Sequence, residues 1–154
     1  MSNLNETEIR ALHEALDDEY RAWATYDQVI ADFGEVLPFR NIREAEARHI
    51  HALHALFVRY DLPVPENRWP AKVDRYASLQ AACEAGVAAE IANGEMYQRL
   101  LAASRRPDIL TTLRSLQEAS QQRHLPAFQR CAQGRTAGVG HGARRRRGPA
   151  GRAR

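Results

Sequence analysis

The chain contains only two cysteines, Cys83 and Cys131, among its 154 residues. They form no C-x-x-C pair and no zinc-ligand pattern, which excludes a zinc ribbon or a rubredoxin-type iron site with four cysteine-class ligands. Alternating runs of valine, isoleucine and threonine, the usual sign of strands, are almost absent. Alanine, leucine, glutamate, arginine and glutamine dominate instead, and these residues favour helices. The sequence therefore predicts an all-α protein.

Long apolar runs are missing as well. No stretch approaches the roughly 20 apolar residues that a helix needs to span a bilayer. The first six residues contain neither the basic segment nor the apolar segment of a secretory signal. We therefore expect a soluble, cytoplasmic protein that has no membrane partner.

Acidic residues are absent from the last part of the chain. All 19 lie at or before Glu118, whereas seven of the 22 basic residues follow Gly134. Residues 1–133 thus contain 15 basic and 19 acidic residues, a formal charge of −4, and the remainder carries +7. We predict one domain over residues 1–133 and a disordered Arg-rich tail over residues 134–154. Such a tail either binds nucleic acid weakly and non-specifically through phosphates or is a solvated extension.

Four segments carry apolar residues in alternating steps of three and four, the spacing of one face of a helix. The first helix is expected to begin with a capping box formed by Asn5 and Glu8 and to end at Gly34. The second is expected to begin after Pro38 and to end near Tyr60. The third and fourth patterns follow over residues 76–100 and 109–131.

A Pro-rich segment, residues 61–70, separates the second and third helices. Its extended backbone reaches about 40 Å, the length of a helix of some 26 residues. We therefore predict an antiparallel four-helix bundle with a long crossover between helices two and three. Pro126 is expected to bend the fourth helix or to weaken one of its hydrogen bonds. Trp23 and Phe128 are expected in the core, and His13, His51 and His54 in solvent.

Charged residues interrupt the apolar stripes at core positions. Glu46 and His49 occupy two positions of the second stripe, and Glu19 and Glu90 occupy one position each of the first and third. Burial of an unpaired charge costs several kcal/mol, so these side chains require compensating partners. A metal ion is one such partner, because Glu and His three residues apart point the same way from a helix. The alternative is a buried cluster of ion pairs and hydrogen bonds without metal.

The two halves of the chain repeat this pattern. Each half carries Glu-x6-Tyr on its first helix and a histidine on its second helix. The residue three before this histidine is Glu in the first half and Gln in the second. The residues are Glu19, Tyr26, Glu46 and His49 in the first half and Glu90, Tyr97, Gln121 and His124 in the second. A Glu from each of two helices with Glu-x-x-His from the other two is the arrangement of di-iron carboxylate bundles. On these motifs the sequence resembles the ferritin-like superfamily. It is most similar to rubrerythrin-type di-iron proteins and to an uncharacterised bacterial branch, a domain of unknown function.

This resemblance implies a metal site and a chemistry. The cofactor would be one or two non-haem iron ions, with manganese as an alternative, and oxygen or peroxide would oxidise ferrous iron in oxidative-stress defence or iron handling. Sustained peroxide reduction would need an external electron donor, since no rubredoxin-like segment is present. A homodimer is expected by analogy. The implied metal ligands are Glu19, Glu46, His49, Glu90 and His124, surrounded by Tyr26, Tyr97, Gln121 and Asn93.

The sequence also departs from the family. Gln121 replaces the fourth carboxylate, and an amide is a poorer ligand than a carboxylate. Asn93 does not restore the additional carboxylate that rubrerythrins have three residues after the equivalent of Glu90. The alternative function is therefore a non-catalytic bundle with a degenerate or single-metal structural site, acting through protein–protein or tail-mediated nucleic-acid interaction. Tyr26 and Tyr97 either hydrogen-bond the carboxylates or are ordinary core tyrosines.

The two cysteines are expected at a similar height in the bundle. Cys83 lies seven residues before Glu90, and Cys131 lies seven residues after His124 on an antiparallel helix. Either they form a redox-active pair about 11 Å from the site, or they are two small buried apolar residues. The second reading is preferred.

Overall fold

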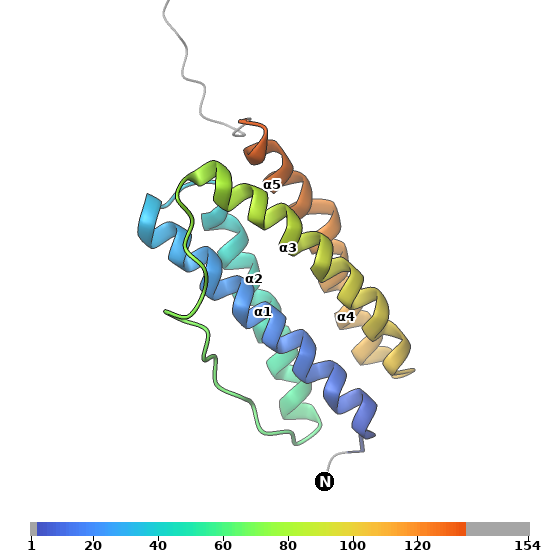
Figure 1. Cartoon of the computed structure of the whole chain (residues 1–154). Coiled ribbons are helices and arrows are strands. Elements are labelled where there is room, and N and C mark those ends of the chain that lie inside the picture. The colour runs from blue at the N-terminus through green and yellow to red at the C-terminus, as the bar shows by residue number, and fades with distance from the viewer. Residues whose placement is uncertain (1–2, 135–154) are drawn as a thin grey trace, which may run out of the picture.

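The computed structural model describes residues 3–134, and within that range it contains helices and no strand. The elements are α1 (Glu6–Phe33), α2 (Phe39–Arg59), α3 (Leu79–Leu100), the short 3₁₀ turn η1 (Leu101–Ala103), α4 (Pro107–Ala119), the π-helical turn η2 (Ser120–His124) and α5 (Leu125–Ala132). The last three elements follow one another without a break and form the fourth rod of the bundle (Figure 1). The predicted all-α four-helix bundle is confirmed. Residues 135–154 of the expected tail lie outside the described range.

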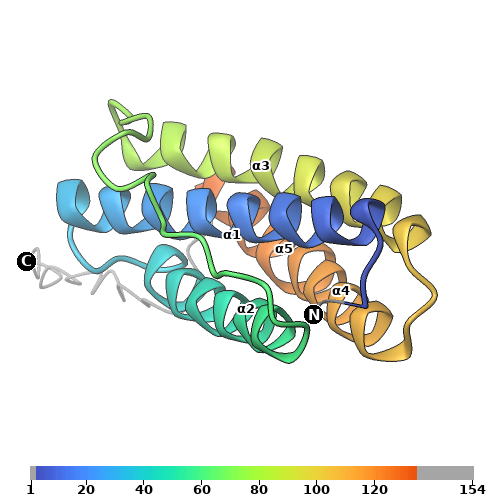
Figure 2. The same cartoon turned by 90° about the horizontal axis from the view of Figure 1, so that it is seen from below.

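The helices form two layers. Figure 1 shows α1 and α3 in front, with α2 and the fourth rod behind them, and Figure 2 shows the same two layers from below. Neighbouring rods run antiparallel. The segment between α2 and α3 crosses the length of the bundle along α1, as its extended, Pro-rich sequence predicts (Figure 1).

The ends of α1 follow from local sequence. The Asn5 side chain accepts a hydrogen bond from the Glu8 backbone N–H at 2.8 Å, and the Glu8 carboxylate accepts one from the Asn5 backbone N–H at 3.1 Å. This reciprocal pair is the predicted capping box. Gly34 ends the helix with φ of 89°, a backbone conformation that favours glycine.

The crossover is tied to α1 through Tyr20. The Tyr20 hydroxyl donates to the Pro65 carbonyl at 2.7 Å, and the Asn67 side chain donates to the Tyr20 carbonyl at 3.2 Å. The His54 Nε2 atom lies 2.7 Å from the same hydroxyl. The expectation that His54 faces solvent is therefore wrong, because its ring is partly buried beneath the crossover.

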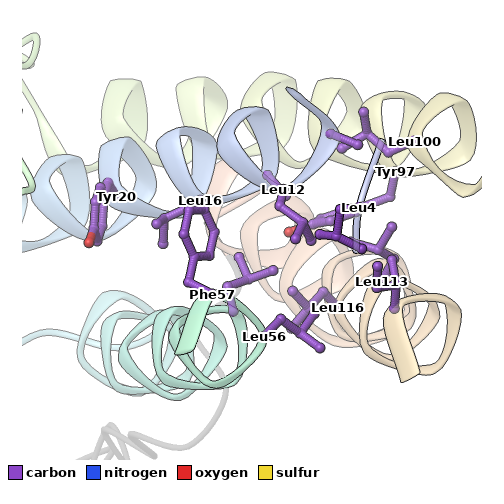
Figure 3. Packing of buried hydrophobic residues seen from close by; sticks show 14 residues of the cluster. Leu4, Leu12, Leu16, Tyr20, Leu56, Phe57, Tyr97, Leu100, Leu113 and Leu116 are labelled. Carbon is purple, nitrogen blue, oxygen red and sulfur yellow. The ribbon is translucent and has the colours of Figure 1, made fainter. Parts of the chain in front are cut away.

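Two apolar clusters fill the bundle. One contains leucines and aromatic rings from all four rods near the start of α1 (Figure 3). The other surrounds Phe39 and Phe128 near the opposite end, so the prediction for Phe128 is confirmed. Trp23 is partly exposed and belongs to neither cluster, contrary to expectation. The neighbouring positions of the same stripe, Glu19, Tyr26 and Ile30, are buried as predicted, so Trp23 is a local exception within the stripe.

Close contact between α3 and α5 completes the second cluster. Cys83 and Cys131 form a disulfide with their Cα atoms 5.8 Å apart, so the preferred reading of two separate apolar residues is wrong. A Cβ atom at Gly86 would lie 2.7 Å from the Phe128 ring, which explains why glycine occupies that position. In the described part of the chain, no helix is both long and apolar enough to cross a membrane.

Candidate metal centre

Five charged side chains meet at mid-height, between the two apolar clusters. Each of the four rods contributes at least one of these side chains, from a position where its apolar stripe is interrupted. Four of the residues are at most 4% exposed, and the His49 side chain is 12% exposed. They are the residues that the sequence pattern singled out: Glu19 on α1, Glu46 and His49 on α2, Glu90 on α3 and His124 at the end of η2.

Glu46 lies at the centre of this cluster. One of its oxygens is 3.2 Å from His49 Nδ1, and the other is 3.2 Å from His124 Nδ1. The same nitrogens lie 3.5 Å from Glu19 and from Glu90, respectively. The two imidazoles stack with their centroids 5.5 Å apart. Both histidines thus direct Nδ1 towards a pair of carboxylates.

The side chains form two overlapping groups of three. Glu19, Glu46 and His49 make one group, and Glu46, Glu90 and His124 make the other. Within each group the candidate ligand atoms lie within 4.8 Å of one another. Glu46 belongs to both groups, so its carboxylate is shared between two neighbouring candidate metal positions. Each position offers two carboxylate oxygens and one imidazole nitrogen.

The donor set suits a divalent transition metal. Carboxylate oxygens and neutral imidazoles are the ligands that non-haem iron and manganese accept. Among residues 3–134, His124 Nδ1 is buried without a hydrogen-bond partner, although Glu46 lies nearby. A buried nitrogen left in this state is costly unless something binds it. The residues therefore fit a metal ion on the Glu46 side of His124.

Two tyrosines hold the outer carboxylates in a reciprocal arrangement. The Tyr97 hydroxyl on α3 donates to Glu19 on α1 at 2.5 Å. The Tyr26 hydroxyl on α1 donates to Glu90 on α3 at 2.9 Å. All four side chains are buried. Each half of the chain thus orients the glutamate of the other half, and both tyrosines are hydrogen-bond donors to the cluster.

Gln121 does not reach the cluster. Its amide nitrogen donates to the Glu90 backbone carbonyl at 2.8 Å and to Ser120 Oγ at 3.0 Å. Gly94 leaves the space for this amide, since a Cβ atom there would lie 2.3 Å from it. Asn93 also stays outside, and its side chain donates to Asp18 at 2.6 Å. These two residues support neighbouring groups and place no atom between the carboxylates.

Ser120 is a functional neighbour that the sequence reasoning missed. Its hydroxyl donates to Glu90 Oε2 at 2.5 Å. The spacing along the fourth helix could have indicated the place of Ser120. Leu116, Ser120, His124 and Phe128 follow one another in steps of four residues. At about 100° per residue, three such steps rotate a side chain by about 120° from its stripe in a regular α-helix.

The π-helical turn η2 corrects that rotation. The Leu125 backbone N–H bonds to the Ser120 carbonyl, five residues earlier, so the turn is wider than in an α-helix. Ser120 and His124 consequently share the buried face with Leu116 and Phe128. Pro126 follows directly and has no N–H to continue the regular pattern. Pro126 was expected to bend the helix or to weaken one of its hydrogen bonds, and what the structure shows there is a wide turn directly before it.

Protonation compensates the buried charges. Burial, together with the nearby Glu46 carboxylate, raises the pKa of Glu19 to about 8. Burial opposes ionisation of Glu46, but the Glu19 carboxyl and the two nearby imidazoles, His124 and His49, hold its pKa below the usual range. Of these two buried groups, Glu19 therefore holds a proton at neutral pH and Glu46 carries the negative charge.

The histidines supply positive charge. Burial disfavours their charged forms, but the adjacent carboxylates outweigh it and raise the pKa of His49 to about 10 and that of His124 to about 9. Without metal, two imidazolium ions thus face the Glu46 and Glu90 carboxylates. A metal ion would replace these protons, which links its affinity to pH.

Comparison with known proteins adds evidence on the fold. No protein-family model matches the chain, and no curated protein matches it. The chain is similar to the crystal structure of hypothetical protein MJ0754 from Methanococcus jannaschii DSM 2661, with a TM-score of 0.77. The match covers 87% of this chain and 84% of that chain at 21% sequence identity. Similarity at this identity supports the four-helix architecture alone.

Proposed function

We propose that this chain is a ferritin-like protein whose buried cluster binds two non-haem metal ions, iron or alternatively manganese. The observation that carries the proposal is the position of Glu46, which is shared by two groups that each contain a further carboxylate and an imidazole. Glu46 would bridge the ions. Glu19 with His49 would complete one position, and Glu90 with His124 the other.

The chemistry of a bound iron would be the oxidation of its ferrous form to the ferric form by oxygen or peroxide. This chemistry would serve iron handling or oxidative-stress defence. The residues of this chain contribute orientation and proton control. Tyr26 and Tyr97 fix the outer carboxylates, and burial excludes bulk water from them. Repeated peroxide turnover would require an external electron donor. Pairing of two chains remains part of the proposal by analogy with ferritin-like bundles.

One observation favours a second candidate function, a non-catalytic bundle with a structural metal or none. Gln121 directs its amide to the Glu90 carbonyl, where a fourth carboxylate would otherwise extend the ligand set. The cluster also balances its charge without metal, by protons on Glu19, His49 and His124. In this alternative the outer faces of the helices would bind a protein partner.

Metal analysis separates the two functions. The full chain is loaded anaerobically with ferrous iron, desalted and analysed by mass spectrometry, beside a Glu46→Ala/His49→Ala variant. The matched control is Glu44→Ala/His51→Ala, which removes the same residue types from exposed positions of α2. Absorbance is then followed as oxygen or peroxide is added.

The proposal predicts two irons per chain in the wild type and in the control, none in the Glu46→Ala/His49→Ala variant, and oxidation of the bound iron. One metal per chain without oxidation would favour the structural alternative. No metal in the wild type would overturn metal binding altogether and leave a helical scaffold.

A further inference from the structure

A cavity of about 400 Å³ lies between α2 and the η2–α5 part of the fourth rod. Its walls are mostly apolar, and the small side chains of Ala45 and Ala127 leave the space open. Its volume falls in the range of pockets that bind small molecules, roughly 300–1,000 Å³. Ile42 and His124 are buried in its wall. His124 therefore belongs both to this cavity and to the carboxylate cluster.

Three of the residues that line the cavity are exposed arginines, which form its rim. Arg48 comes from α2, Arg123 from η2 and Arg130 from α5. All three are exposed, whereas Ile42 and His124 are buried. The cavity consequently combines a positively charged rim with an apolar interior.

The charges of these arginines are not neutralised by acidic side chains of the described residues. Within residues 3–134, none of the three forms an ion pair, and no aspartate or glutamate lines the cavity. Among the described residues, five other arginines pair with carboxylates, whereas surface arginines such as Arg10, Arg68 and Arg114 do not; the paired ones are Arg43, Arg59, Arg75, Arg99 and Arg106. Residues 1–133 carry a net charge of −4, so this uncompensated positive rim differs in sign from the domain as a whole.

The opposite face of the bundle provides a contrast. A second cavity, of about 350 Å³, lies between α1 and α3 and also reaches the cluster, through Glu90. Its lining includes the carboxylates of Asp18 and Glu90 and a single arginine, Arg21. The two faces therefore differ in charge, and the face formed by α2 and α5 is the one that suits an anion.

We propose that the cavity between α2 and α5 binds a small organic monocarboxylate with an apolar body. The guanidinium groups of Arg48, Arg123 and Arg130 would hold the carboxylate, because their planar N–H donors match its two oxygens. The apolar body would fill the interior beside Ile42 and end near His124. This inference goes beyond the metal proposal and does not rest on it, since it uses only the charged rim and the apolar walls.

Calorimetric titration of the full chain with octanoate tests the proposal. Octylammonium provides an apolar body one methylene longer with the opposite charge, and acetate provides the carboxylate without the body. The proposal predicts that octanoate binds, that its affinity falls as salt is added, and that the two comparison compounds bind at least about tenfold more weakly. Equal binding of octylammonium would overturn the role of the arginines, and equal binding of acetate would overturn that of the apolar interior.

Variants then locate the site. An Arg48→Gln/Arg123→Gln/Arg130→Gln protein should bind octanoate about tenfold or more weakly, from the summed loss of three solvent-exposed charge contacts. The matched control, Arg10→Gln/Arg68→Gln/Arg114→Gln, changes the net charge equally at exposed positions that do not line the cavity. Its affinity should stay within about twofold of wild type. The arginines after Gly134 are the same in both proteins and cannot cause a difference between them.

A third variant blocks the interior without changing charge. Ala127→Leu should reduce octanoate binding by about tenfold or more, because the larger side chain occupies the space that the ligand needs. Circular dichroism would verify that the variant is folded. No octanoate binding by the wild type, or equal affinity in the two triple variants, would overturn the proposal whatever the metal content of the protein.

Discussion

The first and second halves of the bundle have the same arrangement of helices but contribute different side chains to the cluster. In both, a glutamate on the first helix accepts a hydrogen bond from a tyrosine of the other half, and a histidine on the second helix directs Nδ1 towards it. The first half adds Glu46 at the centre. The equivalent residue of the second half, Gln121, turns to the Glu90 backbone instead.

The second half holds its residues by other means. The wide turn η2 places Ser120 against Glu90, and the Cys83–Cys131 disulfide joins α3 to α5. Only the first half therefore contributes a central carboxylate, while only the second has a covalent link. The comparison indicates that the cluster depends on one residue, Glu46, far more than on its counterpart Gln121.

Substitution of Glu46 should have the largest effect. Glu46→Gln would leave the charged His49 and His124 without their shared carboxylate, and removal of one member of a buried ion pair costs about 3–5 kcal/mol. We expect the free energy of unfolding of the metal-free protein to fall by this amount, measured by urea denaturation, and both metal ions to be lost.

The matched substitution in the second half is Gln121→Ala. It removes a hydrogen bond to the Glu90 carbonyl and should cost about 1 kcal/mol, with metal content unchanged. Equal losses in the two variants would contradict the unequal roles assigned to the halves.

Removal of the covalent link should come next. The disulfide joins residues 48 positions apart, and closure of a loop of this length stabilises a protein by about 4 kcal/mol in the chain-entropy account. A Cys83→Ala/Cys131→Ala variant should therefore unfold at lower urea concentration but bind the same amount of metal. Thiol titration of the denatured wild type should give two thiols only after reduction. Free thiols without reductant would show that the link is absent from the protein in solution.

The two tyrosines should differ in importance. Tyr97→Phe and Tyr26→Phe each remove one donor from a buried carboxylate, a loss of about 1–3 kcal/mol. Glu90 keeps the Ser120 donor, whereas Glu19 has no serine partner of this kind, so we expect the larger loss for Tyr97→Phe. Urea denaturation of both variants measures the difference, and a larger loss for Tyr26→Phe would be inconsistent with it.

A pH series should show a smaller, metal-dependent effect. The pKa values of His49, His124 and Glu19 are raised, to about 10, 9 and 8. Protons on these groups stabilise the folded metal-free protein fully below the unfolded pKa of each, and this contribution is lost as pH rises through the folded values. The metal-free protein should therefore become less stable between about pH 7 and 10.

Metal binding should release these protons, so its stabilising effect should increase over the same pH range. Thermal unfolding of loaded and metal-free protein at each pH measures the difference directly, because other titrating groups affect both forms. A difference in melting temperature that stays constant or shrinks as pH rises would contradict the protonation states assigned to the cluster.

Much of the architecture was predictable from the sequence because helical periodicity is a local property. The capping box at Asn5, the end of α1 at Gly34 and the length of the crossover all follow from residues close together in the chain. The members of the cluster were also predictable, since charged residues at core positions of several stripes converge only at one height. Their roles as metal ligands remain a prediction.

The remaining features depend on contacts between distant segments. The direction of the Gln121 side chain depends on the wide turn before Pro126 and on the gap left by Gly94. The disulfide depends on the approach of α5 to α3, and His54 is covered only because the crossover passes over Tyr20. Trp23 is partly exposed although Glu19 and Tyr26, its neighbours on the stripe, are buried, so helical periodicity alone could not place it.

The most direct test of the central claim is the anomalous scattering map of a crystal soaked with manganese(II). Two peaks should lie on either side of the Glu46 carboxylate, one near His49 Nδ1 and one near His124 Nδ1, separated by about 3.5–4 Å as in other two-metal sites. A map without peaks in the cluster, with both imidazoles still against Glu46, would contradict the metal centre and leave a self-neutralised polar core.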